Sequence, residues 1–274
     1  MRARDLLKLA IASLAALGAS GCCFSGLTRQ AERKVVEAAP KGPPDGPKMY
    51  VVSATTLNLR AAASAEAAVV SAAGHGEAVV VTGPSIGSER VGGIAGSWTP
   101  VWWNGTNGWA FDGFLLPFHA PPANCTKLGD WASALGENGP PVVVLRKSCQ
   151  SLGIDDNGDD GYCEERTRTP LIGGGWYESM SGYEWAEEVI YLPGVKRDAL
   201  WAAARTCLRN TVNLSVLGLP THAGEVALDG AEEGMATAVV DGESVGWDWS
   251  EGCSQYVRVR RVAGDAEVTV GFGC

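Results

Sequence analysis

One acidic run has residue types that suit a metal ion. Asp155, Asn157 and Asp159 stand at alternate positions, and Ca²⁺ prefers several carboxylate and carbonyl oxygens supplied by one flexible loop. The later positions of the run do not match the pattern of a calcium loop, because the sixth position is Asp160 instead of glycine and the twelfth is Arg166 instead of glutamate. We therefore expect a solvated turn, keep calcium as the alternative for this loop, and expect no cofactor elsewhere.

The histidines argue against catalysis by a cysteine nucleophile or by zinc. A nucleophilic cysteine needs a base to take its proton, and a zinc hydrolase needs several ligands. Outside residues 49–118 only His119 and His222 are available, without paired spacing, and no histidine follows Cys253. We therefore expect neither kind of enzyme and interpret Cys253 as a disulfide partner.

Sugar hydrolysis makes a smaller demand, since glycosidases need only two carboxylates. Glutamates and aromatic residues lie close together in one segment: Glu178, Glu184, Glu187 and Glu188, with Trp176, Tyr177, Tyr183 and Trp185. Joined by Trp247 and Trp249, the aromatic rings could instead form a glycan-binding surface, although such rings more often fill cores. Acids are abundant in this chain, so the pattern is unspecific. A carboxylate-based hydrolase is the alternative hypothesis, and no catalytic residue is assigned.

The elements that position these residues are clearest in residues 49–118, which read as short strands separated by turns. The motifs are Leu57-Asn58-Leu59-Arg60, Trp98-Thr99-Pro100-Val101-Trp102-Trp103, Asn104-Gly105-Thr106-Asn107-Gly108-Trp109-Ala110 and Phe114-Leu115. The Asn-Gly pair predicts a tight hairpin. This stretch resembles the bacterial SH3-like domain, a small β-barrel that usually tethers proteins to the cell wall and carries no catalytic residues.

The resemblance implies a binding surface on this domain. The residues expected to contact a ligand are Asn58, Arg60, Trp98, Trp102 and Trp109. Arg60 also has a structural interpretation, in which it bonds the loop that follows its strand. That loop, residues 61–67, borders the peptide groove in SH3-like domains, and it begins with alanines where the family commonly has Ser-Gly-Pro-Ser.

Side-chain alternation along the Trp98 strand predicts which residues face the core. Val101 and Trp103 should point inward and Trp102 outward. An outward tryptophan indicates either a contact with a partner or cover by the long Gly-rich loop at residues 84–96.

The N-terminus reads as an export signal followed by a tether. A basic start and an apolar run that is too short to span a bilayer predict a signal peptide at residues 1–21. Ala19-Ser20-Gly21-Cys22 resembles the bacterial lipobox, which implies lipidation of Cys22. Residues 22–48 are charged and proline-rich and should form a semi-stiff spacer. Cys23 follows the lipidated position in place of aspartate, which by analogy favours the outer membrane over the inner.

Residues 119–274 read as a second domain of α+β type with no recognised family. An amphipathic helix is predicted at residues 195–209, and alternation predicts a terminal hairpin at residues 255–272. In an oxidising compartment the even set of cysteines predicts disulfides with undetermined pairing. These cysteines are Cys125, Cys149, Cys163, Cys207, Cys253 and Cys274.

The sequence as a whole predicts a mainly β protein: a small SH3-like β-barrel followed by a disulfide-rich α+β domain with mostly antiparallel strands. The net charge of −9 disfavours nucleic acid as a partner. We expect a non-catalytic lipoprotein of the cell envelope, anchored to a membrane by its lipid, that binds peptidoglycan peptides or an envelope protein. The alternatives are a cell-wall hydrolase with its site in residues 119–274, and a scaffold whose acidic C-terminal domain docks a partner protein.

Overall fold

The computed structural model describes residues 43–53, 55–147, 164–182, 185–209, 218–227, 235–241, 243–251 and 253–273. Several predictions fall outside these ranges: the signal peptide, Cys22, most of the tether, the acidic loop with Asp155, Asn157 and Asp159, and Cys149, Cys163, Tyr183, Glu184 and Cys274. Residues 40–274 form one compact unit. In the described part of the chain, no helix is long and apolar enough to cross a membrane.

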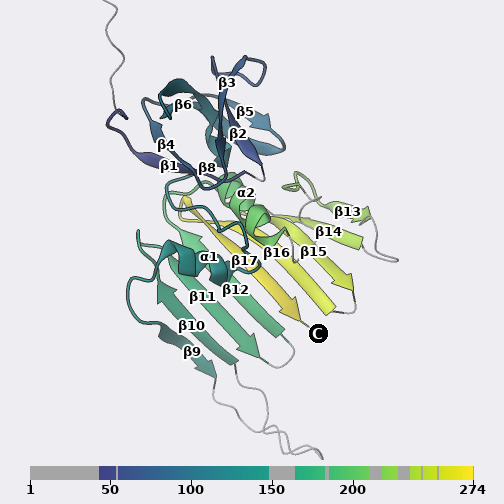
Figure 1. Cartoon of the computed structure of the whole chain (residues 1–274). Helices are drawn as coiled ribbons and strands as arrows, with labels where there is room; N and C mark the ends of the chain where they lie inside the picture. Colours follow the sequence, from purple (N-terminus) through teal and green to yellow (C-terminus); the bar gives the residue numbers. More distant parts are fainter. Residues whose placement is uncertain are drawn as a thin grey trace, which may run out of the picture. The chain divides into compact units, whose positions relative to one another are not determined.

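The first part of this unit is an eight-stranded antiparallel sheet, called here the N-terminal sheet (Figure 1). Its strands are β1 (Lys48–Val51), β2 (Thr56–Arg60), β3 (Val69–Gly74), β4 (Ala78–Val81), β5 (Ile86–Val91), β6 (Ile94–Trp103), β7 (Thr106–Phe111) and β8 (Leu115–Leu116), with the 3-10 helix η1 (Asp112–Phe114) before β8. Hydrogen bonds join them in the order β3-β2-β7-β6-β4-β1-β8, and β5 pairs with β6.

The predicted hairpin is present between β6 and β7. Asn104 and Gly105 both have positive φ values, 46° and 83°, as a two-residue hairpin turn of this hand requires. Val101 is buried and Trp103 packs against the small core that this sheet encloses, so the predicted inward pair is confirmed. Alternation along β6 then places Trp102 on the outside.

The second part is a nine-stranded antiparallel sheet, called here the C-terminal sheet. Its strands are β9 (Val142–Lys147), β10 (Glu164–Pro170), β11 (Trp176–Gly182), β12 (Trp185–Leu192), β13 (Gly224–Ala227), β14 (Met235–Val240), β15 (Ser244–Glu251), β16 (Cys253–Val262) and β17 (Asp265–Gly273). They pair in the order β13-β14-β15-β16-β17-β12-β11-β10-β9. The prediction of a mainly β chain with antiparallel strands is confirmed.

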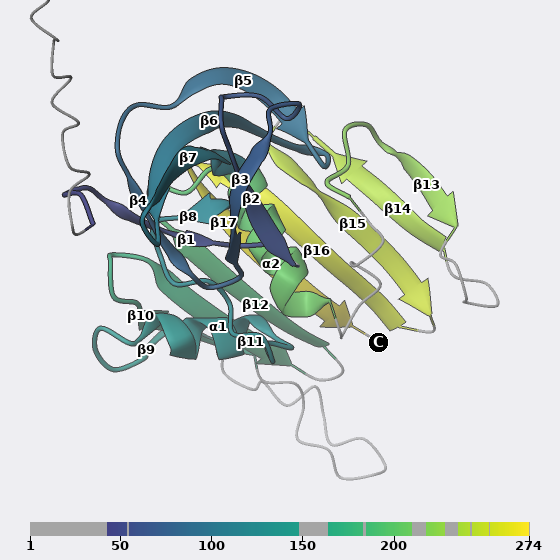
Figure 2. The same ribbon diagram turned by 45° about the horizontal axis from the view of Figure 1, so that its top comes forward.

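Two helices cover one face of this sheet (Figures 1 and 2). Helix α1 (Leu128–Leu135) contacts β11 and β12, and α2 (Arg197–Leu208) contacts β16 and β17. We call this the helix face and the opposite side the open face. Helix α2 carries a run of alanines beside Leu200 and Trp201, and nearly all of its residues are buried. Small side chains let its backbone approach the sheet closely, and the larger ones fill the core.

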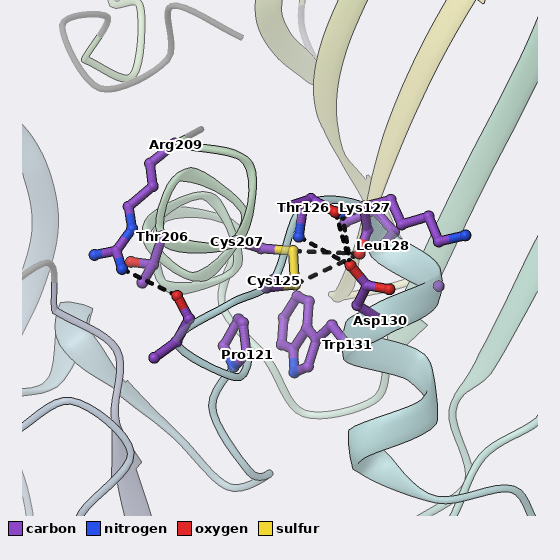
Figure 3. Close-up of a disulfide and its surroundings, with 12 residues drawn as sticks. Pro121, Cys125, Thr126, Lys127, Leu128, Asp130, Trp131, Thr206, Cys207 and Arg209 are labelled. Carbon is purple, nitrogen blue, oxygen red and sulfur yellow. Dashed lines mark hydrogen bonds between the residues drawn. A yellow bond between two sulfur atoms is a disulfide. The ribbon is translucent and has the colours of Figure 1, made fainter. Parts of the chain in front are cut away.

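A disulfide joins the segment before α1 to the end of α2 (Figure 3). Cys125 and Cys207 are both buried, and their Cα atoms are 4.6 Å apart. The start of α1 is fixed by two acids. Asp130 accepts hydrogen bonds from the backbone N–H groups of Thr126 and Lys127, and Glu188 on β12 accepts one from the N–H of Leu128 at 2.8 Å.

The two sheets share a hydrophobic core. The predicted boundary at residue 118 lies just after β8, yet Ile94, Trp98 and Phe111 belong to the same buried cluster as the residues of α2. Polar contacts cross the same junction. Asp198 of α2 accepts a hydrogen bond from the N–H of Ala95 at 2.8 Å. The junction is therefore packed and hydrogen-bonded in the manner of a domain interior.

Candidate binding surface on the N-terminal sheet

Four neighbouring strands place one residue each in a row across the outside of the N-terminal sheet. Val69 of β3 lies opposite Arg60 of β2, which lies opposite Trp109 of β7, which lies opposite Pro100 of β6. Trp102 lies two residues along β6 from Pro100, on the same face. We call these five residues the outer patch.

Arg60 has a fixed place in the outer patch. One guanidinium N–H donates a 2.7 Å hydrogen bond to the carbonyl of Ala67, at the end of the loop at residues 61–67. This is the structural interaction that the sequence suggested. A guanidinium has five N–H donors in a rigid fork, so Arg60 can hold the loop and still present donors to a carboxylate.

The aromatic residues of the outer patch are half-buried. Trp109 packs against the edge of the large core together with Ala63 and Ala65 of the loop. Trp102 lies beside Val80 of β4 and Asn107 of β7. A half-exposed tryptophan held by its neighbours offers a large apolar surface at little entropic cost, which is typical of recognition sites.

The two other predicted ligand residues lie differently. Trp98 is only 3% exposed and packs edge-on against Phe111, with ring centroids 5.5 Å apart. It belongs to the core and offers no open ring face to a ligand. Asn58 is exposed on β2, two residues from Arg60 on the same side and opposite Ala72 of β3. The structure thus brings Arg60, Trp102 and Trp109 together and leaves Asn58 at their margin.

The sequence motifs did not indicate Val69 and Pro100 as members of the outer patch. Whether these two residues belong to the outer patch depends on which strands pair and on the irregular register of β2 and β3 near Arg60. The one local signal is the exposed pair Val69 and Val70, at 51% and 44% exposure. Neither motif residues nor alternation along a single strand would reveal that Val69 lies next to Arg60.

The candidate catalytic groups are occupied elsewhere. Cys125 and Cys207 pair with each other, and Cys253 is disulfide-bonded as well. His75 is 2.7 Å from the carbonyl of Pro121, and the ring of His119 lies 4.2 Å from that of Tyr50. Among the residues that the structure describes, no three His, Cys, Asp or Glu side chains are grouped as metal ligands.

The glutamates considered for sugar hydrolysis lie on opposite faces of the C-terminal sheet. Glu188 points to the helix face and accepts a 2.7 Å hydrogen bond from the Tyr177 hydroxyl. Burial and this bond raise the pKa of Tyr177. Glu187 points to the open face and accepts a hydrogen bond from Tyr256. Both oxygens of Glu178, also on the open face, are near arginines: Arg168 bonds one, and Arg166 lies 3.6 Å from the other.

The aromatic residues proposed as a glycan surface also divide between the two faces. Tyr177, Trp247 and Trp249 lie on the helix face, and both tryptophans are buried there. Trp176 and Trp185 lie on the open face. Trp176 stacks on Tyr191 with centroids 5.5 Å apart and has the Arg168 guanidinium over its ring. These residues therefore do not form one surface.

Comparison of the chain with known protein families, curated proteins and solved structures found no match. Function is therefore inferred from the chain's own residues and geometry. The outer patch combines two half-exposed indole rings, an arginine with free donor capacity and apolar neighbours. Such a surface can stack on or pack against an extended peptide and bind its carboxylate or carbonyl groups.

Proposed function

We propose that the protein is a non-catalytic lipoprotein of the cell envelope that binds cell-wall peptides on the outer patch of an SH3-like N-terminal domain. One observation supports this most directly. The strand register puts Arg60, Trp102 and Trp109 on a single face, although Arg60 lies more than half the domain away from the two tryptophans in sequence. These are three of the residues that the family resemblance marks for ligand contact.

The chemistry of the outer patch suits such peptides. Cell-wall peptides carry carboxylates beside small apolar side chains. Arg60 would bind a carboxylate through its guanidinium fork, and the indole faces of Trp102 and Trp109 would cover the apolar groups. The lipobox at Cys22 would hold the protein at a membrane, and the proline-rich tether would let the patch reach the wall.

Co-sedimentation of the full chain with purified peptidoglycan sacculi tests this proposal. Trp102→Ala should weaken binding by about tenfold or more, because central aromatic contacts commonly contribute about 2 kcal/mol to binding. Trp185→Ala is the matched control. It removes a tryptophan of similar exposure from the C-terminal sheet and should leave binding unchanged.

Two results would contradict the proposal. Sacculi that fail to retain the wild-type chain would exclude the wall as its ligand and direct the search to envelope proteins. Equal losses in the two tryptophan variants would show that binding does not involve the outer patch.

A further inference from the structure

A cavity of about 380 Å³, called here the junction cavity, lies where three parts of the fold meet. Its walls come from β5 and β6, from residues 196–198 at the start of α2, and from the end of β16 with the turn into β17. Ser88, Lys196 and Arg261 in its lining are exposed, so a solute can enter from solvent. The described lining includes no residue of the outer patch, so this is a separate candidate site.

Hydrogen bonds between the walls fix the shape of the junction cavity. Asp198 of α2 accepts one from the N–H of Ala95 on β6 at 2.8 Å. Asp265, at the start of β17, accepts one from the N–H of Gly194, just before α2, at 2.8 Å. The start of α2 is therefore tied both to β6 and to the β16–β17 turn, and the cavity is formed before any ligand binds.

The two acids of the lining already have a hydrogen-bond donor at each carboxylate oxygen. One oxygen of Asp198 accepts the β6 bond described above, and the other accepts a bond from Nε of Arg197 at 3.4 Å. One oxygen of Asp265 accepts the Gly194 bond, and the other accepts a bond from the Tyr191 hydroxyl at 2.6 Å. The bonds from Tyr191 and Gly194 hold the pKa of Asp265 below its ordinary value. Both acids therefore have their partners within the protein.

The cations of the lining have donors to spare. Lys196 bonds Asp112 at 2.7 Å and, like any ammonium, has three N–H donors. Among the described residues, neither the terminal NH₂ groups of Arg197 nor the guanidinium of Arg261 has a partner. A guanidinium presents a planar fork of N–H donors that fits a carboxylate. Open donors beside acceptors that are already bonded favour a ligand that supplies oxygen acceptors, which is an anion.

The rest of the lining favours a polar body for that anion. Ala95, Gly96 and Gly264 have little or no side chain, and the described lining contains no large apolar residue. The hydroxyls of Ser88 and Ser97 make no hydrogen bond within the described ranges, so each can bond a ligand hydroxyl. A volume of about 380 Å³ corresponds to on the order of twelve water-sized groups, which is the size of one sugar ring with a substituent.

We propose that the junction cavity binds a single acidic sugar, a monosaccharide ring that carries one carboxylate. The carboxylate would bind Arg197 and Arg261, and the ring hydroxyls would bond Ser88 and Ser97. A phosphate ester would fit less well, because the two ionised acids of the lining would repel its charge of about −1.5 to −2 more strongly than a single negative charge. The inference does not depend on the function proposed for the outer patch.

Calorimetric titration of the full chain with glucuronate and with galacturonate tests the proposal, and at least one of them should bind saturably. Glucose has the ring of glucuronate without the carboxylate and should bind at least tenfold more weakly than the tighter acid, a difference of about 1.4 kcal/mol. Acetate has the charge without the ring, and glucose 6-phosphate has the ring with a larger charge. Both should also bind at least tenfold more weakly.

Variants then locate the binding. Arg261→Gln should weaken binding of the acidic sugar at least tenfold and retain the fold, since this exposed side chain holds no described neighbour in place. Arg197→Gln should do the same, and a thermal melt would show that this less exposed site still folds. Lys48→Gln is the matched control: it removes one exposed positive charge from β1 and should bind as the wild type does. Trp102→Ala should also bind normally, which separates this site from the outer patch.

Several outcomes would overturn the proposal. No saturable heat from either acid would exclude an acidic sugar, and equal binding of acetate would indicate a simple anion site that makes no use of the ring. Equal binding of glucose would exclude a role for the carboxylate, and equal binding of glucose 6-phosphate would point to a phosphate ester instead. An unchanged affinity in both folded arginine variants, or an equal loss in Lys48→Gln, would place binding outside the junction cavity.

Discussion

The two faces of the C-terminal sheet are built from the same strands but differ in chemistry: the helix face is mainly apolar and buried, and the open face is rich in charged residues. In β16, Val257 and Val259 point to the helix face and are fully buried, while Arg258 and Arg260 point to the open face. In β17, Val268 lies on the helix face, and its neighbour Glu267 lies on the open face. Alternation of side chains along β16 and β17 places these valines on one face and these charged residues on the other.

The open face shows that charge on a surface need not indicate a ligand. Glu178 and Glu267 are only 3% and 6% exposed, because arginines on the neighbouring strands lie over them. Arg260 bonds Glu267 at 2.6 Å, and Arg258 bonds Asp248 at 2.6 Å. These carboxylates already have partners within the sheet. The outer patch of the N-terminal sheet differs, since Arg60 donates to the carbonyl of Ala67 and, within the described ranges, to no carboxylate.

The largest difference between the faces should appear when one tryptophan is removed from each. Trp201 of α2 is fully buried in the large core on the helix-covered side of the sheet, so Trp201→Ala should lower the free energy of unfolding by about 3–5 kcal/mol. Trp176→Ala, on the open face, should cost less than half as much, because its ring is partly solvated. Urea denaturation of both variants measures this, and equal losses would show that the open face is packed as tightly as the core.

The disulfide should contribute a similar amount. Cys125–Cys207 closes a loop with a sequence separation of 82 residues, and a loop of that length predicts about 4.5 kcal/mol of stabilisation through the unfolded chain. The double variant Cys125→Ala/Cys207→Ala isolates this bond, whereas a reducing agent would also reach the disulfide of Cys253. A midpoint of urea denaturation equal to that of the wild type would contradict the expectation.

The charged pairs of the open face should differ among themselves according to burial. Glu178→Gln removes a carboxylate from two arginines at a buried position, and we expect a loss of about 1–3 kcal/mol. Asp248→Asn weakens a pair whose side chains are 35% and 41% exposed, and we expect less than about 1 kcal/mol. If the two variants lose the same stability by urea denaturation, burial does not determine the strength of these pairs.

Sequence patterns predicted the elements that show a clear periodicity. Apolar residues on one side of residues 195–209 predicted α2, which spans Arg197–Leu208, and alternation predicted the hairpin of β16 and β17. Helix α1 was missed because eight residues give too few turns for a pattern. Strand β10 was missed because its positions on the helix face hold Thr167 and Thr169 in place of apolar residues.

The candidate site was predictable only in part, because it depends on pairing between strands. Local motifs pointed to Arg60, Trp102 and Trp109. They could not distinguish the buried Trp98 from the half-exposed Trp102, since both lie on the same side of β6. The surroundings of the two residues differ. Trp98 belongs to the large core shared with α2, and Trp102 does not belong to that core.

The smallest expected effect concerns the start of α1. Hydrogen bonds from the backbone and side chain of Thr126 and the backbone of Lys127 lower the pKa of Asp130 below its ordinary value of 3.8. A carboxyl whose pKa is lowered by folding stabilises the protein above its unfolded pKa, and this contribution is lost as the pH falls through the folded pKa. The stability difference between the wild type and Asp130→Asn should therefore be constant above about pH 5 and shrink below pH 4.

Denaturation of both proteins at a series of pH values from 2 to 6 measures this difference. Glu89→Gln, which removes an exposed acid from β5, is the matched control and should show no such convergence with the wild type. A difference between the wild type and Asp130→Asn that persists to pH 2 would mean that Asp130 acts on α1 through its shape and not through its charge. The neutral amide would then disturb the turn itself, and geometry would matter more than charge for how Asp130 stabilises the start of α1.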